Sequence, residues 1–157
     1  MSAKNLFVMC GIPGSGKSTW ISQNRPNAYV ISRDKVRFSL VQEDQPYFSQ
    51  ETKVFKTFIK QIQDALDSDD TPQDIYCDAT HITKASRDKL FNALNLKNVE
   101  NVIVIVLRPT LQETLRRNNL RVGRERVPES AIIRMWHQFQ RPENDEDRIF
   151  DTMYVEV

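Results

Sequence analysis

The segment GIPGSGKSTW (residues 11–20) constrains the fold of this chain more than any other stretch of its sequence. It follows the apolar run NLFVMC and contains three of the four glycines in the chain. Four of its residues complete the pattern G-x-x-x-x-G-K-[ST], which forms a phosphate-binding loop between a buried strand and a helix: Gly11, Gly16, Lys17 and Ser18. Glycines let the backbone approach phosphate oxygens closely, and the following helix directs unpaired N–H groups at the same anion. The segment therefore predicts a nucleoside triphosphate site.

The chemistry of such a loop assigns a task to each polar side chain in it. Lys17 supplies a cation to the β- and γ-phosphates, Ser18 offers a hydroxyl to Mg²⁺, and Thr19 reaches the α-phosphate. We therefore expect ATP, or another nucleoside triphosphate, with Mg²⁺ as cofactors. The residues expected to bind the nucleotide here are Gly11, Pro13, Gly14, Ser15, Gly16, Lys17, Ser18 and Thr19. The loop alone does not distinguish a kinase from a GTPase, a motor or a switch.

Short apolar runs alternate with longer helical patterns along the rest of the chain. Strands are expected at residues 5–10, 28–32, 74–78, 101–107 and 151–157. Helices are expected at residues 17–24, from 34 onward, 48–66, 84–95, 110–119 and 129–141. This alternation is typical of right-handed β-α-β crossovers. We predict an α/β fold of the P-loop kinase-like type, three-layered (α/β/α), with a mostly parallel sheet of about four or five strands and an arginine-bearing lid.

Apolar residues at helical spacing also predict which helix faces are buried. The expected buried stripe of the 48–66 helix consists of Phe48, Thr52, Phe55, Ile59, Ile62 and Leu66. The expected core residues of the 129–141 helix are Ile132, Ile133, Met135, Trp136 and Phe139. Ligands in parallel α/β folds bind at the carboxyl ends of the strands. Three polar groups fall there, at residues 11–19, 32–37 and 78–81.

The composition narrows the class of protein. A length of 157 residues fits one domain, spanning residues 1–157, and 27% charged residues is an ordinary soluble balance. The longest apolar run, VIVIVL, is too short to cross a bilayer, and the N-terminus does not read as a signal peptide. We therefore expect a cytoplasmic protein without membrane contact. Cys10 and Cys77 lie in apolar runs and are predicted to be buried thiols.

Charge is distributed unevenly although the net charge is only +1. Residues 116–126 contain five arginines and one glutamate. Such a segment can form a lid over nucleotide phosphates, with Gly123 permitting a turn, or it can be a solvated loop or a nonspecific nucleic-acid patch. The presence of the phosphate loop favours the lid.

A second group of candidates follows the second expected strand. Asp34 and Arg37 are three residues apart and share a helix face. A carboxylate beside the γ-phosphate can accept a hydroxyl proton, and an arginine on the same face can hold a phosphate of the acceptor. Alternatively, Asp34 only caps the helix and Arg37 is solvated. The spacing alone leaves both interpretations open.

A third group follows the strand at residues 74–78. Asp78 can orient Mg²⁺ through water, bind the acceptor, or simply cap the next turn. Thr80 and His81 are weaker candidates for acceptor contacts, as is Arg87, and a surface position with no such role is the commoner outcome for a lone histidine.

Four segments in this order resemble the phage-type 5′-polynucleotide kinase family, the end-healing enzymes of nucleic-acid repair. They are GIPGSGKSTW, SRDKVR, YCDATH and RRNNLRVGRERVPESAIIRMWHQF, and together they extend over nearly the whole chain. The resemblance implies that Asp34 is the general base toward the 5′-OH and that Arg37 contacts the 3′-phosphate of the acceptor. It also implies that Arg117 and Arg121 are lid arginines that grip the nucleotide phosphates. Val127 and Pro128 match the start of the helix after the lid.

The chain departs from the family pattern at two places. His81 stands where the family often has asparagine, and the spacing of the lid differs, so that Arg124 or Arg126 could replace or supplement Arg121. Longer members of the family carry a phosphatase or ligase domain. We expect neither activity in this polypeptide, and separate ligase or phosphatase partners are possible.

The expected activity is transfer of the γ-phosphate of ATP to the 5′-OH end of a DNA or RNA strand, or to a nucleoside 3′-phosphate. The residues expected to act in catalysis are Asp34, Lys17, Arg37, Arg117 and Arg121. The residues expected to bind the acceptor are Asp34, Arg37, Asp78, Thr80 and His81. A small-metabolite kinase and a regulatory ATPase without an acceptor remain alternatives. The sequence does not determine the preference for DNA or RNA, the preferred nucleotide or the oligomeric state.

Overall fold

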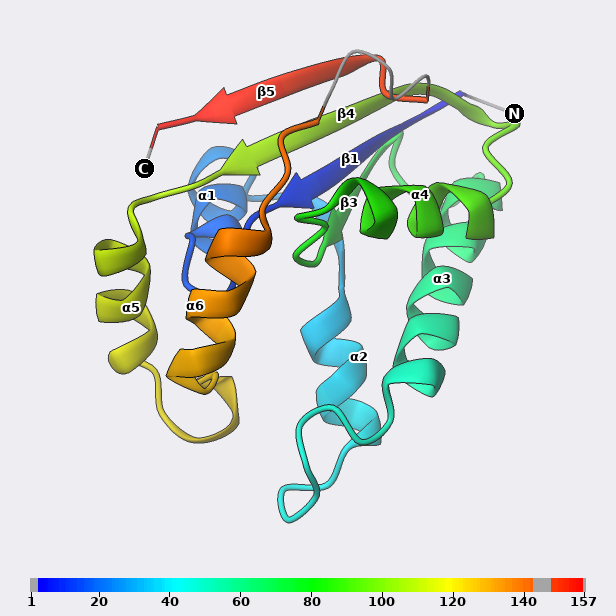
Figure 1. Ribbon diagram of the computed structural model, residues 1–157. Coiled ribbons are helices and arrows are strands. Elements are labelled where there is room, and N and C mark those ends of the chain that lie inside the picture. Colours follow the sequence, from blue (N-terminus) through cyan, green and yellow to red (C-terminus); the bar gives the residue numbers. More distant parts are fainter. Residues whose placement is uncertain (1–2, 143–147, 157) are drawn as a thin grey trace.

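A single parallel sheet organises the computed structural model, which describes residues 3–142 and 148–156. Within these residues the sheet has five strands in the order β2-β3-β1-β4-β5 (Figure 1). They are β1 (Lys4–Cys10), β2 (Tyr29–Ser32), β3 (Asp74–Asp78), β4 (Val99–Leu107) and β5 (Asp151–Val155). Every neighbouring pair is parallel, which confirms the predicted α/β fold. The central position of β1 brings the glycine-rich segment to the middle of one edge of the sheet.

The helices connect these strands as crossovers. They are α1 (Lys17–Asn24), α2 (Arg33–Leu40), α3 (Glu51–Asp67), α4 (Lys84–Ala93), α5 (Leu111–Asn119) and α6 (Glu129–Gln138), with a short 3₁₀ turn η1 (Gly123–Glu125). Thr110 caps α5, because its side chain accepts a hydrogen bond from the amide of Glu113. Among the described residues no helix has both the length and the hydropathy needed to cross a membrane.

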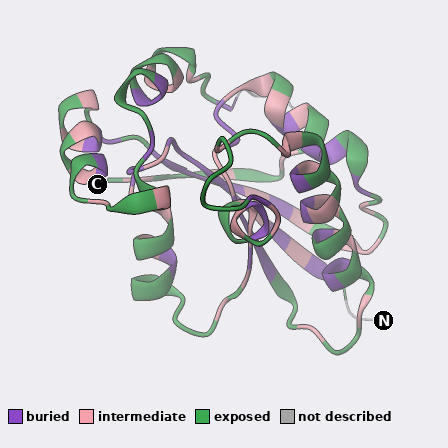
Figure 2. Cartoon of the chain, turned by 90° about the horizontal axis from the view of Figure 1, so that it is seen from below, coloured by how far each residue is buried: buried purple, intermediate pink, exposed green. Residues whose placement is uncertain are grey.

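Two faces of the sheet carry different helices. Leu6, Val8 and Cys10 of β1 belong to the cluster that also contains Phe58 of α3 and Leu90 of α4. The opposite face packs against α1 through a second cluster of buried residues: Met9, Ile21, Tyr76, Ile105 and Leu107. Figure 2 shows the burial concentrated along the strands and the inward sides of the helices. Both cysteines are buried within the strands, as predicted.

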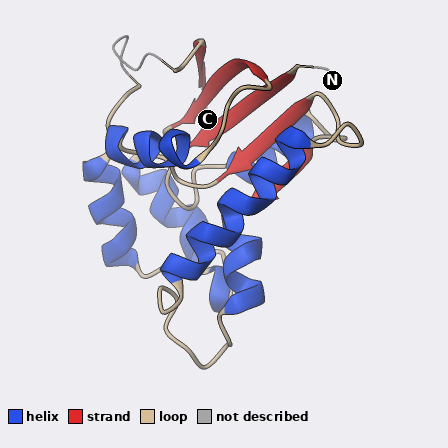
Figure 3. Ribbon diagram, turned by 90° about the vertical axis from the view of Figure 1, so that its right-hand side faces the viewer, coloured by secondary structure: helices blue, strands red, loops and turns tan. Residues whose placement is uncertain are grey.

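The remaining helices lie beyond the carboxyl ends of the strands, where Figure 3 shows helices extending away from the sheet. The apolar side of α6, with Ala131 and Ile132, packs with Val127 against Ile12 of the glycine-rich segment and Ile82. Burial of such side chains stabilises the fold by about 1.5–3 kcal/mol each. The helix after the basic segment is therefore fixed to the phosphate loop by apolar contacts.

Two predicted helix faces differ from the structure. The helix α3 begins at Glu51, so Phe48 lies outside it and is 49% exposed. The face that packs on the sheet consists of Val54, Phe58, Ile62, Ala65 and Leu66. The expected stripe was wrong at Phe48 and Thr52, because apolar residues occupy two adjacent rows of this helix and spacing alone does not tell which row meets the sheet. In α6, Ile133 is 38% exposed and not part of the core.

Candidate active site

The glycine-rich segment forms a loop between β1 and α1. Gly14 and Gly16 have φ values of 86° and 98°, the left-handed region that side chains disfavour. A side chain would also be too close to its neighbours: a Cβ on Gly16 would lie 3.2 Å from the Arg117 guanidinium, and one on Gly14 would lie 3.0 Å from the Thr114 carbonyl oxygen. The loop therefore needs glycine both for its turns and for its close packing against α5.

Lys17 is the first residue of α1 and folds back over the loop. Its ammonium donates hydrogen bonds to the carbonyl oxygens of Gly11 (2.7 Å) and Ile12 (3.1 Å). Burial lowers the pKa of Lys17, and the charges of Asp78 and then Asp34 oppose this shift. The charges of both carboxylates therefore reach the Lys17 ammonium.

Ser18 and Asp78 form a hydroxyl–carboxylate pair beside the loop. The Ser18 hydroxyl donates to Oδ2 of Asp78 at 2.8 Å. Asp78 ends β3, which pairs with β1, so the sheet itself brings the two side chains together. In P-loop proteins a loop Ser or Thr and a strand-end Asp hold Mg²⁺. The donor set and the left-handed glycines of the loop fit a nucleotide with Mg²⁺, and Asp78 lies beside Ser18, the residue expected to hold the metal.

Asp34 lies in the first turn of α2, and its side chain remains 53% exposed. It is not the helix cap, because the N-cap is Ser32, whose side chain accepts a hydrogen bond from the amide of Lys35. One carboxylate oxygen of Asp34 accepts hydrogen bonds from the Arg37 guanidinium and from the Tyr47 hydroxyl, the latter at 2.9 Å. Asp34 is therefore oriented by two donors while part of it stays open to solvent.

Arg37 is only 6% exposed, which excludes a solvated role. Its Nε and Nη2 donate to the two carboxylate oxygens of Glu51, at 2.8 Å and 3.1 Å, and its Nη1 donates to Asp34 and to the Tyr47 hydroxyl at 3.0 Å. The guanidinium also lies over the rings of Tyr47 and Phe48. Every nitrogen of Arg37 is engaged within the protein. In this structure Arg37 orients Asp34, and its expected contact with an acceptor phosphate stays a prediction.

The environment of these groups keeps each in the protonation state that the network needs. Burial, followed by the charge of Asp34, raises the pKa of Tyr47 well above its usual value, so Tyr47 stays a hydrogen-bond donor. Burial alone would raise the pKa of Glu51, but the hydrogen bond and charge of Arg37, with those of Arg33, lower it overall. The pair of Glu51 and Arg37 therefore remains ionised at neutral pH.

The arginines of the basic segment point in different directions. Arg117 donates to the Ser15 carbonyl oxygen of the phosphate loop at 3.1 Å and to Glu113 at 2.9 Å. Arg121 lies close enough to lower the pKa of Lys17. These placements bring Arg117 and Arg121 to the nucleotide side of the site.

Arg124 and Arg126 make their hydrogen bonds away from the phosphate loop. Arg126 donates to the side chain of Asn119 at 3.1 Å, and Arg124 donates to carbonyl oxygens at the end of α2. Among these three arginines, Arg121 contributes to the lowered pKa of Lys17, which favours Arg121 as the lid arginine.

A pair of hydrogen bonds closes the loop that carries these arginines, here called the lid segment (residues 119–126). The buried Asn118 side chain donates to the Val127 carbonyl oxygen at 2.7 Å and accepts from the Val127 amide at 3.0 Å. Val127 and Pro128 lead directly into α6, as expected. Sequence reasoning missed Asn118 and Glu51, because their partners are defined by tertiary contacts and not by spacing.

The segment after β3 differs from its expected role. The Thr80 carbonyl oxygen accepts from the amide of Gly11 at 2.9 Å, so this residue supports the phosphate loop. His81 is 4% exposed with a φ of 43°, and its Nδ1 lies 2.9 Å from the Met9 carbonyl oxygen. The expected acceptor contact and the expected surface position of His81 are both wrong. Arg87 is fully buried and donates to the His81 carbonyl oxygen at 2.9 Å.

Burial of His81 predicts loss of stability in mild acid. Burial lowers the pKa of His81 to about 4, from an unfolded value near 6.5. Between these values the unfolded state binds more protons, so the free energy of unfolding falls as the pH falls through this window. We expect a loss of about 2 kcal/mol between pH 7 and pH 5 from this residue. Urea unfolding at both pH values tests this prediction. His81→Gln is expected to reduce the change in the free energy of unfolding between the two pH values, and the control His137→Gln, at an exposed site, is expected to leave that change as it is. The same change in His81→Gln as in the wild type would contradict the role of His81.

The parallel sheet, the phosphate loop and the carboxylates around Lys17 define a P-loop kinase-like nucleotide-binding domain. The sequence profile of the family described as "AAA domain" matches residues 6–142. This match extends over most of the chain, and the chain belongs to that family.

Solved structures share the fold at low sequence identity. A putative kinase from Chloroflexus aurantiacus superposes with a TM-score of 0.70 at 11% identity, covering 99% of this chain and 86% of that one. A chain of the Pnkp1/Rnl/Hen1 RNA repair complex gives 0.70 at 20% identity, covering 88% of this chain and 44% of that one. A gluconokinase from Sinorhizobium meliloti gives 0.59 at 17% identity, covering 100% and 85%. No curated protein sequence matches the chain significantly.

Proposed function

We propose that the chain is an ATP-dependent kinase that phosphorylates the 5′-OH end of a nucleic-acid strand. The observation that carries the proposal is the Asp34 carboxylate, which Arg37 and Tyr47 orient at the start of α2, within electrostatic reach of Lys17 on the phosphate loop. A nucleotide-binding switch has no need of an oriented, half-exposed carboxylate opposite its terminal phosphate. A phosphotransferase needs such a group to accept a proton.

The arrangement assigns each group a part in the reaction. Asp34 accepts the proton of the 5′-OH as the oxygen forms a bond to the γ-phosphorus, and the bond from that phosphorus to the β–γ bridging oxygen breaks, releasing ADP. Lys17, with Arg117 and Arg121 from the other side, stabilises the charge on the phosphate oxygens. Mg²⁺, which Ser18 and Asp78 would hold, supplies further charge neutralisation when bound. Closure of the lid segment excludes water that would otherwise hydrolyse ATP.

The choice of a nucleic-acid end rests on three supports. The four sequence segments occur in the order of the 5′-polynucleotide kinase family. A structure from an RNA repair complex superposes with a TM-score of 0.70, against 0.59 for the gluconokinase. Phe48 is 49% exposed in edge-to-face contact with Tyr47, which binds Asp34, so an aromatic surface lies beside the proposed base. Aromatic surfaces of this kind stack on bases of single strands.

A small-metabolite kinase is the second candidate, because the gluconokinase shares the fold and the Arg37 guanidinium already binds Glu51 and Asp34. One experiment separates the two. The protein is given γ-labelled ATP with Mg²⁺ and, in parallel, 5′-OH DNA and RNA oligonucleotides, a nucleoside 3′-phosphate, the bare nucleoside and gluconate. We expect label on the oligonucleotides and the 3′-phosphate in preference to the nucleoside and gluconate. Label on gluconate alone, or ATP hydrolysis unaffected by every acceptor, would overturn the proposal.

A further inference from the structure

We propose that Arg124 is a positioning residue that ties the lid segment to α2, so that closure over the nucleotide and alignment of Asp34 occur together. The proposal rests on the proposed phosphoryl transfer for its consequence in catalysis. The structural link itself is independent of which acceptor the protein uses.

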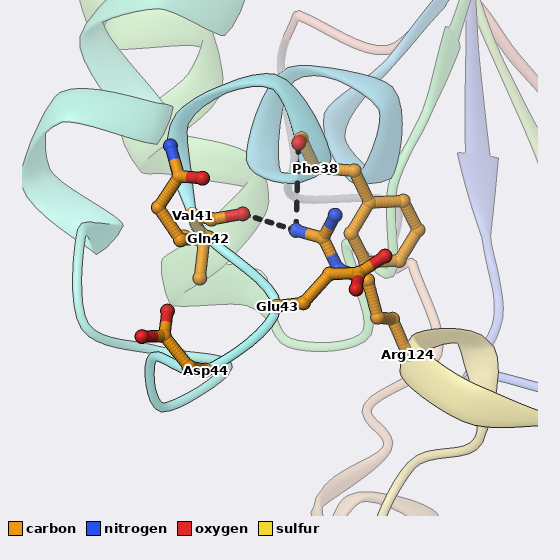
Figure 4. Close-up of a pocket in the computed structure, with 6 residues that line it drawn as sticks. All are labelled: Phe38, Val41, Gln42, Glu43, Asp44 and Arg124. Atoms are coloured by element: carbon orange, nitrogen blue, oxygen red, sulfur yellow. Dashed lines mark hydrogen bonds between the residues drawn. The ribbon is translucent and has the colours of Figure 1, made fainter.

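The Arg124 guanidinium bridges two parts of the chain that are more than eighty residues apart. Its Nη2 donates to the carbonyl oxygens of Phe38 and Val41, which lie in the last turn and at the C-cap of α2 (Figure 4). The guanidinium also lies over the Phe38 ring, 4.6 Å from its centroid. Carbonyl oxygens at a helix end lack partners within the helix and carry its partial negative charge, so a cation is favoured there. Arg124 thus caps α2 from outside.

Few other contacts hold the lid segment. Leu120 is 70% exposed, Val122 is 80% exposed, and a Cβ on Gly123 would meet nothing within 4 Å. Among the described residues, every hydrogen bond from this segment to α2 comes from Arg124. The base of the segment is fixed by Asn118 and Val127, so the tip can move about a fixed base while Arg124 sets where it docks.

The docking point adjoins an open depression at the end of α2. A cavity of about 550 Å³ is lined by Phe38, Val41, Gln42, Glu43, Asp44 and Arg124. Figure 4 shows the Arg124 side chain reaching from the lid segment across the edge of this cavity to α2. A contact at the edge of a cavity can form and break without disturbing packed side chains. The contact of Arg124 with α2, here called the latch, can therefore be a reversible link between the lid segment and this helix.

The two ends of α2 explain why the latch matters for chemistry. Asp34 lies in the first turn of the helix and the Arg124 contact in its last, and eight residues span about 12 Å as one rigid element. Arg121 of the same lid segment acts on Lys17. Docking of Arg124 therefore links the helix that carries Asp34 to the lid segment, which follows shortly after Arg117 and its hydrogen bond to the Ser15 carbonyl oxygen of the phosphate loop.

Hydrogen exchange with and without Mg²⁺ and a non-hydrolysable ATP analogue tests the link. In the wild type we expect the analogue to slow exchange both in the lid segment and at residues 38–45. In Arg124→Ala we expect slowing in the lid segment only. Arg134→Ala, which removes an exposed arginine from α6, is the matched control and should behave as the wild type.

The kinetic constants distinguish a positioning role of Arg124 from a role in stability alone, because loss of stability alone would not lower kcat. We expect Arg124→Ala to lower kcat by about tenfold, the scale of a small misalignment of the reacting groups, with the ATP dissociation constant within twofold of the wild type. Arg124→Lys, which keeps the charge but not the planar fork, should recover part of the loss. If the analogue still slows hydrogen exchange at residues 38–45 in Arg124→Ala, the proposed latch is wrong. If the analogue slows exchange in both segments of the wild type but no oligonucleotide is phosphorylated, the latch is supported and a nucleic-acid end is rejected as the acceptor.

Discussion

Replacing Asp34 with asparagine is expected to abolish phosphoryl transfer and to leave nucleotide binding intact. Asparagine keeps the shape of the side chain and can still accept hydrogen bonds from Arg37 and Tyr47. It cannot take the proton of the attacking hydroxyl, so we expect kcat to fall by about 10³-fold, within the range found for general bases. The dissociation constant for ATP should change little, because the phosphates are held by the loop at residues 11–18 and by Lys17. Transfer from γ-labelled ATP and equilibrium binding of ATP measure the two quantities.

The control for this variant is Asp64→Asn, which removes an exposed carboxylate paired with Lys60 on α3. That change is expected to leave both quantities unaltered, since exposed ion pairs contribute little. Undiminished transfer by Asp34→Asn would show that another group accepts the proton. Loss of ATP binding in the same variant would instead show that Asp34 acts on the nucleotide and not on the acceptor.

The parts of the fold that the sequence predicted depend on local pattern. The phosphate loop, its flanking strand and α1 follow from glycine spacing and an apolar run, and β4 follows from its β-branched centre. Parallel pairing then brings the ends of β1, β2 and β3 to one edge of the sheet. Asp34 and Asp78 were placed at this edge for the same reason, and both act on Lys17. Local sequence patterns were sufficient to predict the position of a residue wherever that position depends on one helix or strand and the element next to it in sequence.

The parts that sequence analysis missed depend on contacts between distant residues. Arg37 resembles a phosphate ligand in sequence, but Glu51, fourteen residues later, brings a carboxylate onto it at the start of α3. The sequence places His81 at the surface or at the acceptor, yet its ring is buried, with Nδ1 at the Met9 carbonyl oxygen and the ring against Phe58. Neither spacing nor composition encodes these pairings, because each arises only once two segments pack together.

Removing the charge of Glu51 is expected to have the largest effect on stability. In Glu51→Gln the nearly buried Arg37 loses its bidentate partner and faces an amide that also donates hydrogen bonds. Arg37 keeps Asp34, but loss of its charged hydrogen bonds to the partly exposed Glu51 costs about 1.5–3 kcal/mol, and Arg33 loses its partner as well. Urea unfolding should show this loss. Turnover should also fall, because Arg37 no longer fixes the orientation of Asp34.

The double variant Arg37→Met/Glu51→Met separates the two roles. Apolar side chains of similar volume can replace a buried ion pair with little loss, so we expect the free energy of unfolding to return to within about 1 kcal/mol of the wild type. Turnover should stay low, since Asp34 then keeps only the Tyr47 hydroxyl as its oriented donor. Recovery of turnover together with stability would mean that the ion pair serves the fold alone. Wild-type stability with low turnover in the double variant would establish that Arg37 and Glu51 orient the Asp34 carboxylate for catalysis.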